Sequence, residues 1–159
     1  MNSDEASGET TPAGAGLVLF AYDGSDLAKI AIEEAARQLA PRRDALVLCV
    51  WQPADVGFVP AGGVHFNAAR ASEVKKAAEE TAARGAELAE MAGFRARSMA
   101  AESAPTWQGI AKVADEHDAA LIVLGSHGRH GFAGRIFGSV AGAVSEHCTQ
   151  SVLIVHRAK

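Results

Sequence analysis

The 159-residue sequence has little cysteine and no long apolar segment. Its two cysteines, Cys49 and Cys148, stand in no C-x-x-C or other regular spacing, which argues against a disulfide scaffold and against a cysteine metal site. We therefore expect two reduced, mostly buried thiols. No apolar run approaches the roughly 20 residues that a membrane-spanning helix needs.

An excess of basic residues is also missing. The chain has 15 Lys and Arg against 19 Asp and Glu, a formal net charge of −4. No basic stripe follows a helix, so neither a nucleic acid nor an anionic membrane surface is an expected partner. The first nine residues are acidic and polar and lack the basic and apolar parts of a secretory signal. These features predict a cytoplasmic protein.

The order of apolar runs and helical patterns predicts the fold. Residues 1–15 are rich in small and polar residues, and we interpret them as a flexible tail before a single domain at 16–159. Strands are predicted at 17–21, 45–50, 94–100, 119–124 and 151–156, and helices at about 27–39, 68–91, 106–117 and 139–148. Alternation of strand and helix predicts a doubly wound α/β fold, Rossmann-like, with a parallel five-stranded sheet between helices.

Two further segments carry expectations. Residues 52–67 contain two prolines and three glycines and are interpreted as a long loop. The helix at 68–91 has a predicted inward side made of Val74, Ala78, Thr81, Gly85, Leu88 and Met91. Trp107, in the following helix, is interpreted as a core residue.

The most informative stretch directly follows the strand at 119–124. It reads Gly125-Ser126-His127-Gly128 and is followed, after nine more residues, by Gly138-Ser139 at the start of a predicted helix. Glycines at the carboxyl end of a parallel strand let the backbone approach a phosphate, and the amides of the next helix attract it. The pattern favours a nucleotide-phosphate site. The alternative is a set of tight turns that merely pack helix on strand.

Three segments resemble the universal stress protein family. They are Val18-Leu19-Phe20-Ala21-Tyr22-Asp23-Gly24-Ser25, the run from Leu121 to Arg129, and the spacing G-x2-G-x9-G-[ST] completed by Gly125, Gly128, Gly138 and Ser139 and followed by the strand at 151–155. The resemblance covers about residues 15–157. Ala120 stands where many relatives carry Asp, and Cys49 replaces a frequent His.

The resemblance implies a protein that binds ATP. By position, Gly125 and Gly128 border the ribose and phosphates, while Gly138, Ser139 and Val140 present amides, together with the Ser139 hydroxyl, to the phosphates. The other implied contacts are Asp23 near the ribose and a Mg²⁺ ion, Val50 at the adenine, and Ala21, Tyr22 and Leu124 in the same crevice. The loop at 52–67 is a candidate lid over the adenine.

Several side chains near this loop have more than one interpretation. No Gly-Lys-[Ser/Thr] of a Walker A loop is present, so Arg129 and Arg135 are the nearest cations, either phosphate contacts or surface residues. His127 and His130 form an H-x-x-H without an obvious third metal ligand and are interpreted as loop histidines. Asp23 could also cap the following helix, and Ser25 is interpreted as a cap and not as a nucleophile.

The predicted function is nucleotide-dependent regulation in the stress response, with binding as the output and any hydrolysis slow. The resemblance implies a homodimer that joins through the last strand, Val152, Leu153, Ile154 and Val155. One alternative is a Mg²⁺-dependent ATPase or a phosphoryl or nucleotidyl transferase that uses the same pocket. The other is a dimerisation module that binds AMP or a cyclic nucleotide.

Overall fold

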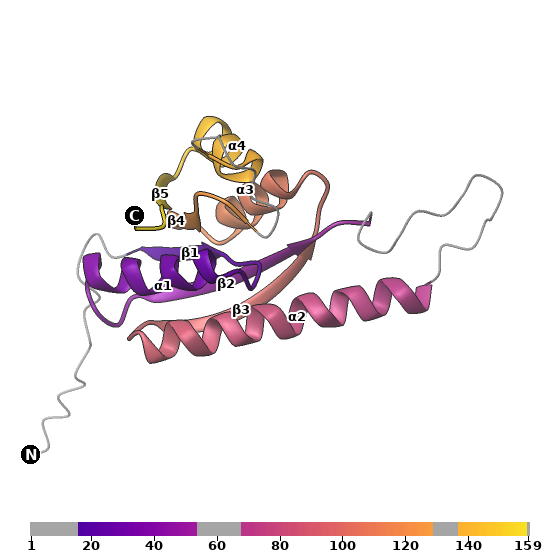
Figure 1. Cartoon of the computed structure of the whole chain (residues 1–159), viewed down its shortest axis with the longest axis horizontal. Coiled ribbons are helices and arrows are strands. Elements are labelled where there is room, and N and C mark those ends of the chain that lie inside the picture. Colours follow the sequence, from indigo (N-terminus) through magenta and orange to yellow (C-terminus); the bar gives the residue numbers. More distant parts are fainter. Residues whose placement is uncertain (1–15, 54–67, 129–136, 159) are drawn as a thin grey trace, which may run out of the picture.

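The computed structural model describes residues 16–53, 68–128 and 137–158. Its centre is one parallel sheet with the strand order β3-β2-β1-β4-β5 (Figure 1). The strands are β1 (Leu17–Ala21), β2 (Asp44–Trp51), β3 (Arg95–Glu102), β4 (Ala119–Gly125) and β5 (Ser151–Val155). The predicted doubly wound α/β fold is confirmed.

Helices cover both faces of this sheet, as Figure 1 shows. Helices α1 (Asp26–Gln38) and α2 (Ala68–Met91) lie on one face, and α3 (Thr106–Glu116) and α4 (Ser139–His147) lie on the other. Alternate residues of β1 enter the two cores: Val18 and Phe20 pack with α1 and α2, whereas Leu19 packs with α3 and α4. A strand buried on both faces explains why its sequence is apolar throughout.

Helix α2 contacts the sheet through small residues. The buried residues on its inner side are Ala78, Ala82, Gly85, Ala86 and Ala89. The prediction that Met91 lies on this inner side is wrong, because its side chain is 77% exposed. A Cβ atom at Gly85 would lie 2.7 Å from both Tyr22 Cδ1 and Val47 Cγ1, so only glycine lets the helix lie this close to β1 and β2.

Within the described ranges, each predicted helix and strand is present with ends within two residues of the prediction. Trp107 and Cys148 are half-buried, less enclosed than expected, and Trp107 stacks on His147 with ring centroids 4.5 Å apart. The expected tail at 1–15 and most of the predicted loop at 52–67 lie outside the described residues.

Candidate functional site

A cavity of about 890 Å³ lies at the carboxyl ends of β1, β2 and β4. The chain builds the sheet outward from β1 in both directions, so the gap between β1 and β4 is the point where the strand order reverses. Open α/β sheets bind their ligands at such a point, since the loops on either side diverge there. Pockets for small molecules commonly hold about 300–1,000 Å³.

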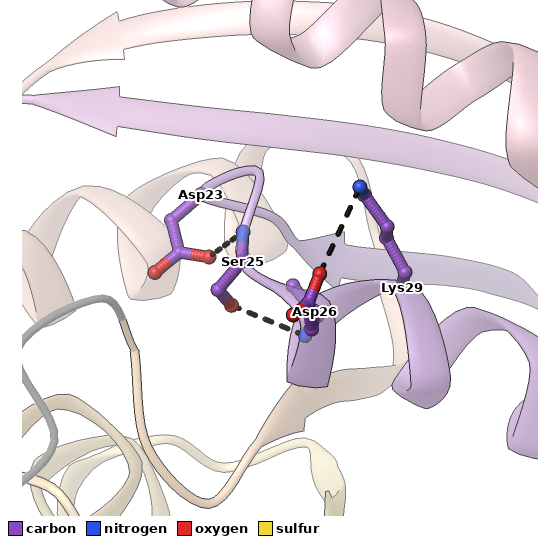
Figure 2. A network of polar contacts seen from close by, with 5 residues as sticks. Asp23, Ser25, Asp26 and Lys29 are labelled. Carbon is purple, nitrogen blue, oxygen red and sulfur yellow. Dashed lines mark hydrogen bonds and ion pairs between the residues drawn. The ribbon is translucent and has the colours of Figure 1, made fainter.

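The turn after β1 forms the first wall of the cavity. Gly24 has a φ of +80°, which glycine adopts without strain, and this turns the chain from β1 into α1. The Ser25 amide donates to Asp23 Oδ1 at 2.9 Å, and Ser25 Oγ accepts from the Ala28 amide at 3.2 Å (Figure 2). Ser25 is therefore the N-cap of α1, as predicted. In Figure 2 the second carboxylate oxygen of Asp23 points away from this turn.

The glycine loop after β4 lies directly against that carboxylate. A Cβ atom at Gly128 would lie 2.7 Å from Asp23 Oδ2, and one at Gly125 would lie 2.8 Å from Leu27 Cγ. Packing within the protein therefore already requires glycine at both positions, because a side chain at either one would meet the start of α1 or the turn before it. Asp23, Gly125 and Gly128 all line the cavity.

Helix α4 begins at the opposite wall. The Gly138 amide donates to the Ser126 carbonyl at 2.6 Å, and this differs from the expectation that Gly138 presents its amide to a ligand. The first amide bonded within the helix turn is that of Gly142, which donates to the Gly138 carbonyl at 3.0 Å. Among the described residues, nothing accepts a hydrogen bond from the three amides between them, those of Ser139, Val140 and Ala141. Such a helix start carries positive partial charge and attracts anions.

The remaining predicted residues form largely apolar walls. Leu124 is buried at the end of β4, and Ala21 and Val50 are half-buried at the ends of β1 and β2. Tyr22 also borders the cavity, but its ring belongs to the core under α1 and α2 and contacts the position of Gly85. Burial of this ring raises the pKa of the Tyr22 phenol above its usual value.

Charge in the cavity is sparse. Of the described residues that line it, Asp23 is the one carboxylate, His127 is the one histidine, and none is Lys or Arg. Arg129, His130 and Arg135 lie outside the described residues. The same part of the chain contains no cluster of three or more His, Cys, Asp or Glu side chains that could hold a metal ion.

The structure adds lining residues that sequence patterns did not reveal. Gln52 at the end of β2 donates from Nε2 to Thr106 Oγ1 at 2.6 Å, and both side chains line the cavity. Helix α2 contributes Val74, Ala77, Ala78 and Thr81. Ser126 is 2% exposed, and its hydroxyl lies 3.1 Å from His127 Nδ1. Of these lining residues, the sequence could have indicated only Ser126, because it lies inside the glycine motif. The contribution of α2 to the cavity depends on tertiary packing alone.

A doubly wound sheet with a ligand-sized cavity and a glycine loop at its switch point defines a class of small-molecule-binding α/β proteins. Residues 16–156 match the model of the universal stress protein family. The chain therefore belongs to the universal stress protein family. None of the helices in the described ranges has the length and apolar character that crossing a bilayer requires.

Two curated relatives are similar over most of this chain. The universal stress protein YxiE of Bacillus subtilis is 34% identical over 145 residues, which are 87% of this chain and 97% of that protein. A universal stress protein of Mycolicibacterium smegmatis is 30% identical over 145 residues, again 87% of this chain. The match spans only 45% of the length of that second relative.

Solved structures share the fold. The structure of the hypothetical protein MJ0577 has a TM-score of 0.74 at 21% sequence identity, covering 91% of this chain and 98% of that one. A universal stress protein solved in complex with cAMP has a TM-score of 0.56 at 25% identity, covering 89% of this chain and 97% of that one.

Proposed function

We propose that this protein binds an adenine nucleotide, with ATP and Mg²⁺ as the leading ligand, in the cavity at the ends of β1, β2 and β4. The observation that carries the proposal is the start of α4, where Ser139, Val140 and Ala141 line the cavity and their amides have no acceptor among the described residues. These amides and the exposed Ser139 hydroxyl supply the phosphate contacts.

The other walls suit the rest of a nucleotide. Val50, Leu124 and Ala21 offer apolar surface for the base, on the side of the sheet that carries α3 and α4. Asp23 lies between this surface and the glycine loop, where a carboxylate can accept from ribose hydroxyls or bind a Mg²⁺ ion. In this proposal the ribose and phosphates lie along Gly125 and Gly128, and Arg129, which lies outside the described residues, is a further candidate phosphate contact.

The small number of charged residues in the described lining favours one alternative, a nucleotide monophosphate. A triphosphate brings about four negative charges, whereas the described lining offers one histidine, no Lys or Arg and the carboxylate of Asp23. A cyclic or linear monophosphate needs less neutralisation than ATP. The relative solved with cAMP, at 25% identity, supports this alternative.

We further propose that binding itself, and not turnover, is the output, in a cytoplasmic homodimer that regulates the stress response. Strand β5 supports the dimer, because it is an edge strand and its Val152, Leu153 and Ile154 are only half-buried in the single chain. A second copy paired along β5 would form hydrogen bonds with the backbone groups of this edge and would cover these side chains.

Calorimetric titration with adenosine, AMP, cAMP and ATP, each with and without Mg²⁺, tests the proposal. We expect saturable binding of ATP with Mg²⁺ and a loss of that binding in Gly138→Val, whose side chain would crowd the Ser126 carbonyl at 3.2 Å and the phosphate space before α4. Gly142→Val is the matched control, because Gly142 lies on the same helix and a Cβ atom there meets nothing within 4 Å. Tighter binding of AMP or cAMP than of ATP would select the monophosphate alternative, and no binding of any of the four would refute the proposal.

A further inference from the structure

Ser126 holds the glycine loop to two neighbouring elements. Its amide donates to the Val155 carbonyl at 2.8 Å, and its carbonyl accepts from the Gly138 amide at 2.6 Å. The backbone of Ser126 is therefore fixed between the end of β5 and the start of α4. Within the described ranges, Ser126 is also the one polar residue in the buried set, with 2% exposure.

The buried hydroxyl of Ser126 faces the neighbouring imidazole. Ser126 Oγ lies 3.1 Å from His127 Nδ1, and a hydroxyl kept from water needs such a partner. The imidazole lies beside the start of α4, because a Cβ atom at Gly138 would be 3.8 Å from His127 Cδ2. The ring therefore lies close to the residue that precedes Ser139, the first residue of that helix. His127 lines the cavity.

We propose that Ser126 is a positioning residue that makes His127 a phosphate ligand. The Ser126 hydroxyl donates to Nδ1 and thereby places the ring proton on Nε2. Nε2 then donates a hydrogen bond to the nucleotide phosphate that the amides of Ser139, Val140 and Ala141 also bind. This inference rests on the proposed nucleotide site and adds a side-chain ligand to it.

Few charged side chains among the described residues share the cavity with the imidazole. Asp23 is the carboxylate nearest to the loop, with Oδ2 at 2.7 Å from the Cβ position of Gly128, and no Lys or Arg of the described residues lines the cavity. A ring held in one tautomer offers one defined donor, and its side chain has only two rotatable bonds to order. The phosphate is then recognised by backbone amides and one imidazole from residues close together in sequence.

The test compares the affinity for AMP with the affinity for adenosine, since only the phosphate separates these two probes. In the unchanged protein we expect AMP to bind more tightly. His127→Gln and Ser126→Ala should each reduce the AMP affinity by roughly tenfold, as expected for one hydrogen bond to a charged group, and leave the adenosine affinity within about twofold. The double variant should lose no more than His127→Gln alone, because Ser126 acts through His127. Ser145→Ala is the control, an exposed serine on α4 whose hydroxyl bonds the Gly142 carbonyl.

A nitrogen-15 NMR measurement of the imidazole tautomer covers the case in which Ser126→Ala folds poorly. The free protein with its natural sequence should show His127 with the proton on Nε2, and a proton on Nδ1 would overturn the inference. If the unchanged protein binds AMP more tightly than adenosine, and His127→Gln and Ser126→Ala both keep the full AMP affinity, this inference is overturned. The proposed nucleotide site would then still stand. Equal affinities for AMP and adenosine in the unchanged protein would overturn the phosphate contact. Binding of neither probe would overturn this inference, and the proposed function would fall as well if cAMP and ATP also failed to bind.

Discussion

Replacing Gly85 with alanine tests how closely α2 is pressed against the sheet. The new Cβ atom would lie 2.7 Å from Tyr22 Cδ1 and from Val47 Cγ1, and both side chains are buried, with 4% and 0% exposure. Overpacking of this kind costs about 1–3 kcal/mol. Replacing a helical glycine by alanine contributes about 1 kcal/mol in the opposite direction. The net change in the free energy of unfolding should therefore lie between about zero and 2 kcal/mol of destabilisation.

Gly142→Ala separates the cost of crowding at Gly85 from the gain in helix propensity that both variants share. Gly142 is also a helical glycine, but a Cβ atom there meets nothing within 4 Å, so only the favourable contribution remains. The two variants should differ by about 2 kcal/mol, which is roughly 4–8 °C in Tm for a domain of this size. Thermal unfolding followed by circular dichroism measures this difference. Equal Tm values for the two variants would refute the close packing of α2 on Tyr22 and Val47.

Three further perturbations concern the turn after β1 and the glycine loop that lies against it. Gly128→Ala should lower the free energy of unfolding by about 1 kcal/mol, because the new side chain pushes the Asp23 carboxylate away from the Ser25 amide. The same substitution should have little effect in an Asp23→Ala background. Equal losses of Tm in both backgrounds would contradict the contact between Gly128 and Asp23. Ser25→Ala should lower the free energy of unfolding in urea by about 1 kcal/mol, because α1 loses its N-cap, and an unchanged unfolding midpoint would argue against the cap. Burial raises the pKa of the Tyr22 phenol, so the neutral form is favoured in the folded state and stability should fall as the pH rises above about 10. The chain has one tyrosine, so tyrosinate absorbance reports this group directly, and Tyr22→Phe should reduce the dependence; an unchanged dependence in that variant would contradict the assignment.

The sequence was sufficient to predict the fold because the strands and helices differ in local pattern. Strands such as β1 and β4 are apolar on both faces, which is typical of a parallel sheet between helices, and the turn residues Asp23 to Ser25 mark the start of α1. The inner side of α2 was harder to predict. The helical spacing correctly selected Ala78 and Gly85, which are buried, but it also selected Met91, which is exposed.

The parts of the candidate site also differ in how far the sequence could predict them. The glycine spacing marked the loop and the start of α4, because close approach of backbone segments requires glycine whatever lies opposite. The spacing did not reveal what each glycine faces: Gly128 faces Asp23, and the Gly138 amide is taken by the Ser126 carbonyl. The Gln52 and Thr106 pair joins residues 54 positions apart, so no local pattern could have shown it.

An amide-resolved NMR titration with ATP and Mg²⁺ tests the central claim most directly, since it locates the ligand as well as detecting it. We expect the largest chemical-shift changes at the amides of Ser139, Val140 and Ala141, followed by Gly125 and Gly128, and we expect these changes to saturate together with the calorimetric binding curve. Shift changes confined to the opposite end of the sheet, around Arg95 and Arg97, or no saturable change at the start of α4, would contradict it.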